Sequence, residues 1–395
     1  MSRTGLAVGG VALFLVGLLA AVWVTRTETP VASAPPTASS PTTSASAAAS
    51  TPSAGPTASP AAAGGLDERF GFIVTSGSAV WVRPENDAQR RTTLTGRFSS
   101  VSADGTQIAL WRATGGTDEL FVVPAARLDQ ERSVYKVPAG QQGVQTVWAN
   151  DGSGLLFTTQ RPATPGSSSG PTVTSSTLVI LDLRTASSAT TVATLTDGRM
   201  HLPIAWDRSN NLAAAGESSV TSSSPRAPVM ETYLTLKTSG TLDVTRRPVT
   251  DGFATIVGSS DAKYVYARAA DSIRYWPLAD YSAGASFTAT GLTGKLLWRP
   301  GTTQIAWLAG QQLDAYDVGT KSTVTLFRGI TRNSATGTDL QLFRADGSAA
   351  VVGPVSIGPG VVAPMTLVVL GSGTAVQFHT ADAIGSGFMA SVRLR

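Results

Sequence analysis

One short motif in the sequence has the spacing of a hydrolase nucleophile. Gly166, Ser168 and Gly170 fit G-x-S-x-G, in which a serine on a sharp strand-to-helix turn attacks a carbonyl carbon. Here the motif lies in TPGSSSGPT, between two prolines, where neither a strand nor a helix is expected. A serine hydrolase also needs a histidine base, and the chain has only His201 and His379. We therefore expect no acyl transfer at Ser168.

The two histidines have different expected surroundings. His379 ends the apolar stretch TAVQFHT, where a histidine at a strand end normally has a structural role. His201 lies in TDGRMHLP, which we expect to form a loop, and it is the better candidate for ligand binding. A structural or solvated role is the simpler interpretation of both.

Metal and cofactor sites are not expected. The absence of cysteine excludes disulfides, cysteine-ligated zinc, a thiol nucleophile and a lipid-modified N-terminal cysteine. Two separated histidines do not make a zinc cluster, and no calcium-loop or phosphate-binding glycine motif occurs in a usable context. An ion held only by backbone carbonyls would leave no signal in the sequence. We predict no cofactor and no side-chain metal site.

Composition narrows the class of protein. Hydrophobic residues make up 42% of the chain and charged residues only 14%, with 40 glycines and 22 prolines, which favours sheets and turns over helices. The net charge is +4, but the basic residues are scattered, and the only arginine doublets are Arg90-Arg91 and Arg246-Arg247. Without a basic stripe, nucleic acid is not an expected partner.

The N-terminal segment indicates a membrane anchor. Leu6 to Val24 carries no charge and is long enough to cross a bilayer as a helix, after a short cytoplasmic segment of residues 1–5. Arg3 precedes this run, while Arg26 and Glu28 follow it, which favours a cytoplasmic N-terminus and an external domain at the plasma membrane. A cleaved signal peptide ending at VASA, residues 31–34, is the alternative.

A low-complexity stretch follows the anchor. Residues 25–65 consist almost entirely of Ala, Ser, Thr, Pro and Gly, a composition that cannot bury enough apolar surface to fold. We predict a disordered linker that holds the domain of residues 66–395 away from the membrane.

A hairpin-like motif recurs through that domain at intervals of 41 to 58 residues. Each copy has a large apolar residue, a turn of Asp, Gly, Asn, Ser or Pro, and a second apolar run. The copies are VSADGTQIALW from Val101, WANDGSGLLFTT from Trp148, WDRSNNLAAAG from Trp206, VGSSDAKYVYAR from Val257, WRPGTTQIAWLA from Trp298 and FRADGSAAVVG from Phe343. This period, with about four strands per copy, predicts an all-β fold, a β-propeller.

The motif resembles the W/F-S-P-D-G-x-x-I/L-A/V-F/Y repeat of TolB-type, WD-repeat-like propellers. Trp298 to Gly301 keeps the aromatic residue and the proline, while Asp104-Gly105 and Asp346-Gly347 keep the Asp-Gly turn. The resemblance covers nearly all of residues 66–395. It implies a propeller architecture, found in protein-interaction modules and in gating domains of peptidases, and it transfers no catalytic residue.

Seven four-stranded blades are the predicted count. Six motifs lie within the chain, and a seventh blade combines three N-terminal strands, Phe70–Ser76, Ala79–Pro84 and Arg90–Gly96, with the last strand, Gly387–Arg395. That pairing would close the ring without a disulfide. Six or eight blades are the alternatives.

Propeller geometry predicts where a ligand binds. The Asp-Gly hairpins share one face, and the loops that join one blade to the next lie on the other, where propellers usually bind ligands. Solvated loop tips are the simpler explanation of the charged residues there. The candidates on this interblade-loop face are Arg97, Asp197, Arg199, His201, Asp251, Lys295, Arg332, Asp339 and Asp382.

The function that follows is binding rather than catalysis. We expect a monomeric, membrane-anchored extracytoplasmic propeller that recognises a protein, a peptide or a cell-envelope glycan. An envelope enzyme of the glycosidase or lyase type, with carboxylates converging on the channel, is the alternative. A signalling or assembly scaffold would differ from the first mainly in its partner.

Overall fold

The computed structural model describes residues 70–76, 79–84, 90–163, 173–185, 188–219, 230–239, 241–249, 255–332, 337–355, 364–379 and 389–393. The predicted membrane helix, the linker and the G-x-S-x-G motif lie outside these residues. Within them, no helix is long and apolar enough to cross a membrane. The only helical element described is the short 3-10 helix η1, Tyr281–Ala283.

The described strands form seven four-stranded antiparallel sheets. In chain order they are β1(Phe70–Ser76), β2(Ala79–Pro84) and β3(Arg90–Thr95) with the last strand β28(Met389–Arg393); β4(Arg97–Val101), β5(Gln107–Thr114), β6(Thr117–Pro124) and β7(Arg132–Lys136); β8(Gln142–Trp148), β9(Gly154–Pro162), β10(Val173–Asp182) and β11(Ser188–Leu195); β12(Arg199–Asp207), β13(Leu212–Ser219), β14(Met230–Lys237) and β15(Asp243–Pro248); β16(Thr255–Gly258), β17(Tyr264–Ala269), β18(Ser272–Pro277) and β19(Ala285–Thr288); β20(Leu292–Trp298), β21(Gln304–Ala309), β22(Gln312–Asp317) and β23(Ser322–Arg328); and β24(Asp339–Phe343), β25(Ala349–Gly353), β26(Pro364–Val369) and β27(Thr374–His379).

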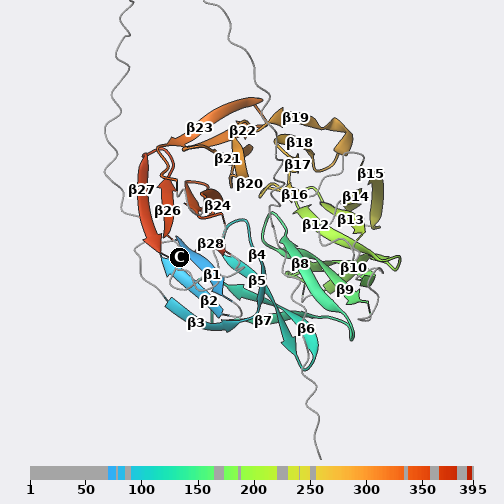
Figure 1. The fold of residues 1–395 in the computed structure, drawn as a ribbon. Helices are drawn as coiled ribbons and strands as arrows, with labels where there is room; N and C mark the ends of the chain where they lie inside the picture. The colour runs from blue at the N-terminus through green and yellow to red at the C-terminus, as the bar shows by residue number, and fades with distance from the viewer. Residues whose placement is uncertain are drawn as a thin grey trace, which may run out of the picture. The chain divides into compact units, whose positions relative to one another are not determined.

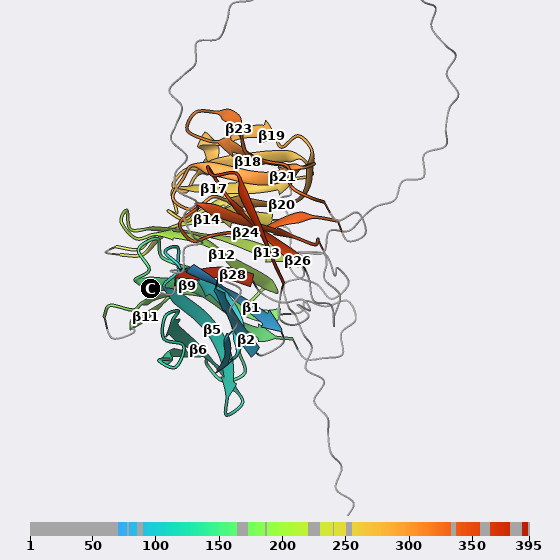
Figure 2. The same ribbon diagram turned by 90° about the vertical axis from the view of Figure 1, so that its left-hand side faces the viewer.

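The sheets follow one another around a central axis, which is consistent with a β-propeller (Figure 1). Strands β28, β4, β8, β12, β16, β20 and β24 are the inner strands, and each begins its sheet's outward order. In the view turned by 90°, the strands are arranged from β5 and β6 at the bottom to β23 at the top (Figure 2). We call the end at which the inner strands start the interblade-loop face, and the end at which they turn into the second strands the hairpin face.

The two ends of the strand-forming unit share one sheet, as expected from the sequence. Phe70 pairs with Arg393 and Val74 with Met389 across the β1–β28 ladder. The neighbouring hairpins also hold the last strand: Arg393 N donates to the Gly105 carbonyl at 2.8 Å, and Ala345 N donates to Ser391 Oγ at 3.1 Å. The last strand is therefore held by hydrogen bonds on both sides, and Val392 also packs into a buried cluster with Leu94 and Ile108.

Asp104 is a turn residue, as the recurrence of its motif predicts. Its Oδ1 accepts hydrogen bonds from Ser102 Oγ at 2.6 Å and from Thr106 N at 3.1 Å. Burial raises the pKa of this carboxyl, but the hydrogen bonds from Ser102 and Thr106 outweigh burial, and the net pKa is lowered. Gly105 has φ +76° and lies against the last strand, where a Cβ would come within 3.0 Å of Arg393 N.

The aromatic residues at the motif starts pack between neighbouring sheets, also as predicted. Trp206 of β12 is 3% exposed and joins Leu156 and Leu178 of the preceding sheet in one buried cluster. Trp298 of β20 is 7% exposed, and its Nε1 donates to the Val257 carbonyl of β16 at 3.2 Å. Large apolar side chains buried between sheets supply the packing that replaces disulfides.

Candidate functional site

The structure places most of the predicted site residues at or near the starts of inner strands. Arg97 begins β4, Arg199 begins β12 and Asp339 begins β24. Lys295 lies within β20, and Arg332 is an exposed residue between β23 and β24. Asp251 and Asp382 lie outside the described residues.

Arg97 links two neighbouring sheets. Its Nη2 lies 2.6 Å from Asp118 Oδ2 of β6 and 2.8 Å from the carbonyl of Gly143 of β8. Asp118 Oδ2 also accepts from Gly143 N at 2.9 Å. The Arg97 side chain is 46% exposed, yet its hydrogen bonds join strands of two sheets. Arg97 therefore serves packing in this structure.

Asp339 and Lys295 link the β20–β23 sheet to the β24–β27 sheet. The Asp339 side chain accepts from Lys295 N at 2.9 Å and from Leu340 N at 2.8 Å, and the residue is 2% exposed. Lys295 Nζ donates to Gln341 Oε1 at 2.9 Å. Burial raises the pKa of Asp339 and lowers that of Lys295.

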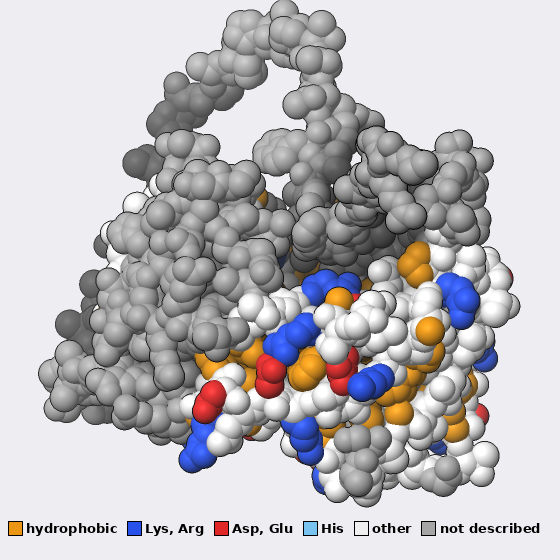
Figure 3. Space-filling view, turned by 90° about the horizontal axis from the view of Figure 1, so that it is seen from below, with side chains coloured by type: hydrophobic (Ala, Val, Ile, Leu, Met, Phe, Trp, Pro, Cys, Tyr) orange, Lys and Arg blue, Asp and Glu red, His pale blue; other side chains and the backbone are white. Residues whose placement is uncertain are grey.

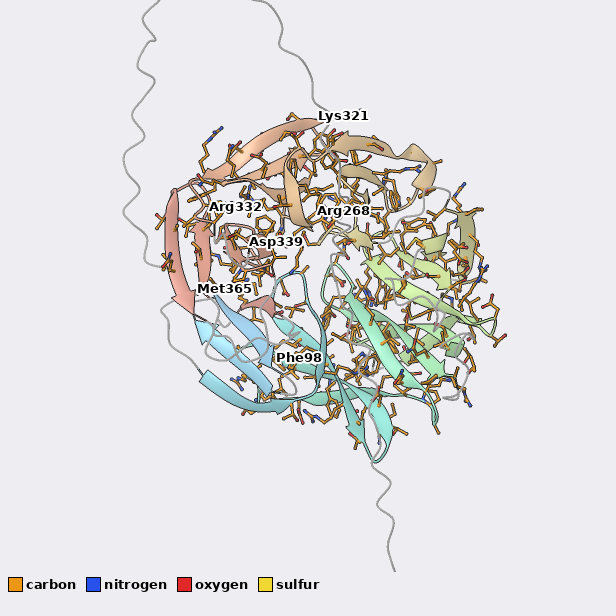
Figure 4. The ribbon with its side chains drawn as sticks, viewed as in Figure 1. Phe98, Arg268, Lys321, Arg332, Asp339 and Met365 are labelled. Carbon is orange, nitrogen blue, oxygen red and sulfur yellow. The ribbon has the colours of Figure 1, made fainter. Side chains whose placement is uncertain are left out.

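Gly294 and Arg268 complete this group, and Arg268 and Asp339 lie toward the middle of the ring (Figure 4). A Cβ on Gly294 would lie 2.0 Å from Asp339 Oδ1, so only glycine fits beside the carboxylate. Arg268 Nη1 donates to the Gly294 carbonyl. Burial lowers the pKa of Arg268, while Tyr266 and Asp339 raise it. These polar groups satisfy one another where three sheets converge.

His201 is a correction to the sequence analysis. It is a residue of β12 rather than of a loop, and it is 0% exposed. The turn at Asp197-Gly198 is short, and β12 begins at Arg199, two residues before His201. Arg199 forms two ion pairs: its Nε lies 3.4 Å from Asp197 Oδ2, and its Nη2 lies 3.2 Å from Glu231 Oε2.

The surroundings of His201 keep its imidazole neutral. Its Nε2 lies 3.8 Å from Glu217 Oε1, which lies 3.2 Å from Arg246 Nε. Neither ring nitrogen has a hydrogen-bond partner. Burial, with a contribution from Arg246, lowers the pKa of His201 to about 4. A wholly buried neutral imidazole cannot contact a ligand in this conformation.

A cavity opens instead on the hairpin face. It has a volume of about 350 Å³ and lies between the β8–β11 sheet and the β12–β15 sheet. Its lining comes from two inner hairpins, the outer part of the first sheet and the end of β14. The residues are Asp151, Ile180, Asp182, Arg184, Ser188, Thr190, Trp206, Arg208, Ser209, Asn211 and Thr238.

Arg208 organises the cavity. Its Nη2 donates to Asp182 Oδ2, and its Cζ lies 5.3 Å from the Trp206 ring centroid, within cation–π range. The side chain is 12% exposed, and its Nη1 is buried without a hydrogen-bond partner. The Arg208 backbone N donates to Asn150 Oδ1 at 3.0 Å, which fixes the start of the hairpin. The guanidinium is therefore held in place before any ligand arrives.

Two carboxylates in the cavity remain ionised. Burial alone would raise the pKa of Asp182. The hydrogen bonds from Arg208 and Arg184 together have the larger, opposite effect, so the net pKa is below its usual value. Asp151 follows the same pattern, with hydrogen bonds from Ser153 and the charges of Arg208 and Arg184 opposing burial. Two carboxylates and two guanidiniums balance, so the cavity favours a ligand with hydrogen-bonding groups and little net charge.

This cavity was not predicted from the sequence, because the hairpins that line it were expected to have only a structural role. The signal was the third motif copy, WDRSNN, in which Ser209-Asn210 stands where other copies have Asp-Gly, with Arg208 directly before it. Asn211 takes the left-handed conformation with φ +52°, so it keeps the turn while presenting a polar amide. Departures from a repeat, rather than the repeat itself, mark this site.

Comparisons with known proteins establish the fold and go no further. No protein-family model and no curated protein matches the sequence. Among solved structures, a putative 6-phosphogluconolactonase from Bacteroides uniformis is similar, with a TM-score of 0.51 at 10% identity over 82% of this chain and 100% of that one. The corresponding protein from Bacteroides fragilis has a TM-score of 0.50 at 8% identity over 83% and 99%.

A prolyl endopeptidase is similar to a lesser degree, with a TM-score of 0.49 and 13% identity. The match covers 80% of this chain and 49% of that one. Identities this low carry no information on activity. The chain has a β-propeller fold with structural similarity to such propellers, without assignment to a family.

Proposed function

We propose that this protein is a binding module of the cell envelope, anchored by residues 6–24 and extended by the linker of residues 25–65. Its propeller has seven blades of the TolB type. Its ligand site is the hairpin-face cavity, and its ligand is an uncharged polar part of a protein, a peptide or a glycan.

One observation carries this proposal: polar groups that are held in place line an open cavity on the hairpin face. Arg208 is fixed by Asp182 and Trp206, while Ser209 and Asn211 are exposed. Arg97, Lys295 and Asp339 on the other face already make hydrogen bonds between strands. Binding sites combine fixed polar groups with a concave surface, and the cavity has both.

Photocrosslinking tests the proposal on the full-length chain in its own membrane. p-Benzoylphenylalanine in place of Ser209 should give discrete adducts. The control is the same residue in place of Lys321, which is exposed on the hairpin face between β22 and β23, away from the cavity (Figure 4). Equal labelling from both positions, or none from Ser209, would contradict the proposal.

A second candidate is a carbohydrate-cleaving enzyme, because Asp151 and Asp182 line one cavity. Glycoside cleavage needs one carboxyl with a raised pKa as the proton donor. The pKa values of both residues are lowered, which favours binding over this chemistry. Turnover of a glycoside panel, abolished by Asp182→Asn, would establish the enzyme instead.

A further inference from the structure

The outer strands of the sheets differ in how they protect their free edges. An outer strand leaves every second backbone N–H and C=O without a partner, and charges, prolines or short length normally discourage pairing with another strand. Strands β3, β7, β15 and β23 each contain Lys, Arg or Asp. Strand β19 has only four residues. Strand β27 also carries neither a charged residue nor a proline, but with six residues it is two residues shorter than β11(Ser188–Leu195).

Strand β11 lacks these protections. It has eight residues, Ser188–Leu195, with the sequence SATTVATL, and carries neither a charge nor a proline. It is the outermost strand of its sheet, paired on one side with β10. Its first six residues are exposed or half-buried. Thr and Val favour the extended backbone that a further strand would require.

The first half of β11 is the regular part of this edge. Ser188 pairs with Asp182 and Thr191 with Val179 in unbroken register. A bulge follows, because Ala193 pairs with Leu178 and leaves Val192 as the extra residue. An added strand can therefore follow residues 188–191, and the bulge limits its length.

This regular part adjoins the hairpin-face cavity. Ser188 and Thr190 both line the cavity, and they lie on one face of β11 because side chains alternate along a strand. An added strand would have its own alternate side chains on that same face. A polypeptide backbone complements the regularly alternating N–H and C=O groups of a strand edge, which favours a peptide over a glycan as the occupant.

We propose that the edge of β11 and the adjoining cavity form a strand-addition site for an extended peptide segment of a partner protein. The segment pairs with residues 188–191 and directs an uncharged polar side chain toward Arg208 and Asn211. This inference rests on the proposed binding function and narrows it to a peptide.

A peptide library tests the inference on the full-length chain in detergent. Random decapeptides displayed on phage are the probe, and the affinity of a selected, synthesised peptide is measured by fluorescence anisotropy. Two methylated versions of the peptide are compared, one with N-methyl groups on its odd-numbered residues and one on its even-numbered residues. Each set, called a phase, removes the N–H donors that point to one side of the peptide strand. Methylation in one phase should weaken binding at least about tenfold, and methylation in the other should have less than about a twofold effect.

Matched variants test the protein side. Thr190→Glu places a charge on the β11 edge and should weaken binding at least about tenfold. Thr323→Glu makes the same change at an exposed position of the outer strand β23 and should leave affinity unchanged. Equal thermal stability of the two variants shows that both are folded.

Three outcomes would overturn the inference. They are failure to select any peptide, equal tolerance of methylation in both phases, and a β11-dependent dimer of the chain that Thr190→Glu dissociates. In each case adducts from position 209 would still support the cavity as a binding site, so the two proposals fail separately.

Discussion

The two faces of the propeller both carry arginine and aspartate residues, but these residues have different surroundings on each face. On the interblade-loop face, Arg97 and Asp339 bond to strands of neighbouring sheets. On the hairpin face, Arg208 and Asp182 also join two sheets, but they do so at the wall of a cavity. A charged residue near the axis is therefore no sign of a ligand site unless space adjoins it.

The largest expected effect is at the interblade-loop face. Asp339→Ala leaves the Lys295 backbone donor without its partner and removes the acidic group beside two half-buried cations, Lys295 and Arg268. We expect the free energy of unfolding to fall by about 3 kcal/mol or more. Urea denaturation of the full chain measures this, and a loss under 1 kcal/mol would mean that the contact is dispensable.

Protonation of the buried His201 should make the free energy of unfolding depend on pH. His201 has a pKa of about 4 when folded and an ordinary value near 6.5 when unfolded. The unfolded chain therefore binds the proton first, and stability falls as the pH drops from about 6.5 to about 4, by up to about 3 kcal/mol. Denaturation midpoints across this range test it, and His201→Gln should flatten the slope. An unchanged slope would contradict the assignment.

On the hairpin face, a substitution should have a small effect on stability and a large effect on binding. Arg208→Ala removes a charge-assisted hydrogen bond to Asp182 and a contact with the Trp206 ring. We expect a loss of only about 1–2 kcal/mol in unfolding free energy, together with loss of crosslinking from position 209. Thermal denaturation and the crosslinking yield are the two measurements. Unchanged crosslinking would separate Arg208 from the site.

The smallest effect is expected for Arg97. Its side chain is 46% exposed, so solvent screens its ion pair with Asp118. Arg97→Ala should lower the unfolding free energy by at most about 1 kcal/mol and leave crosslinking from position 209 unchanged. Urea denaturation gives the first quantity. A loss of crosslinking would mean that the two faces are coupled.

Charged side chains of both signs are mixed on one surface of the molecule. On the face shown in Figure 3, acidic and basic side chains lie close together with hydrophobic ones between them, and no continuous basic stripe crosses its coloured part.

Repeats made the fold predictable, and their irregularities made the site hard to predict. The Asp-Gly turns and the aromatic residues at motif starts indicated hairpins and inter-sheet packing, and Asp104 and Trp298 have those roles. His201 was misplaced because an Asp-Gly pair does not tell where the following strand begins. The cavity needs residues from two sheets and from β11 at once, which no local pattern encodes.

The ladder between β1 and β28 also has a consequence for the timing of folding. It joins residues about 320 positions apart, so one sheet stays incomplete until the last strand is available. Contacts of such high sequence separation form late, because the entropy of closing the intervening chain must be overcome first. Until then β1 exposes an unpaired edge. The six sheets built from consecutive strands can assemble beforehand, and the last five described residues determine when the ring becomes complete.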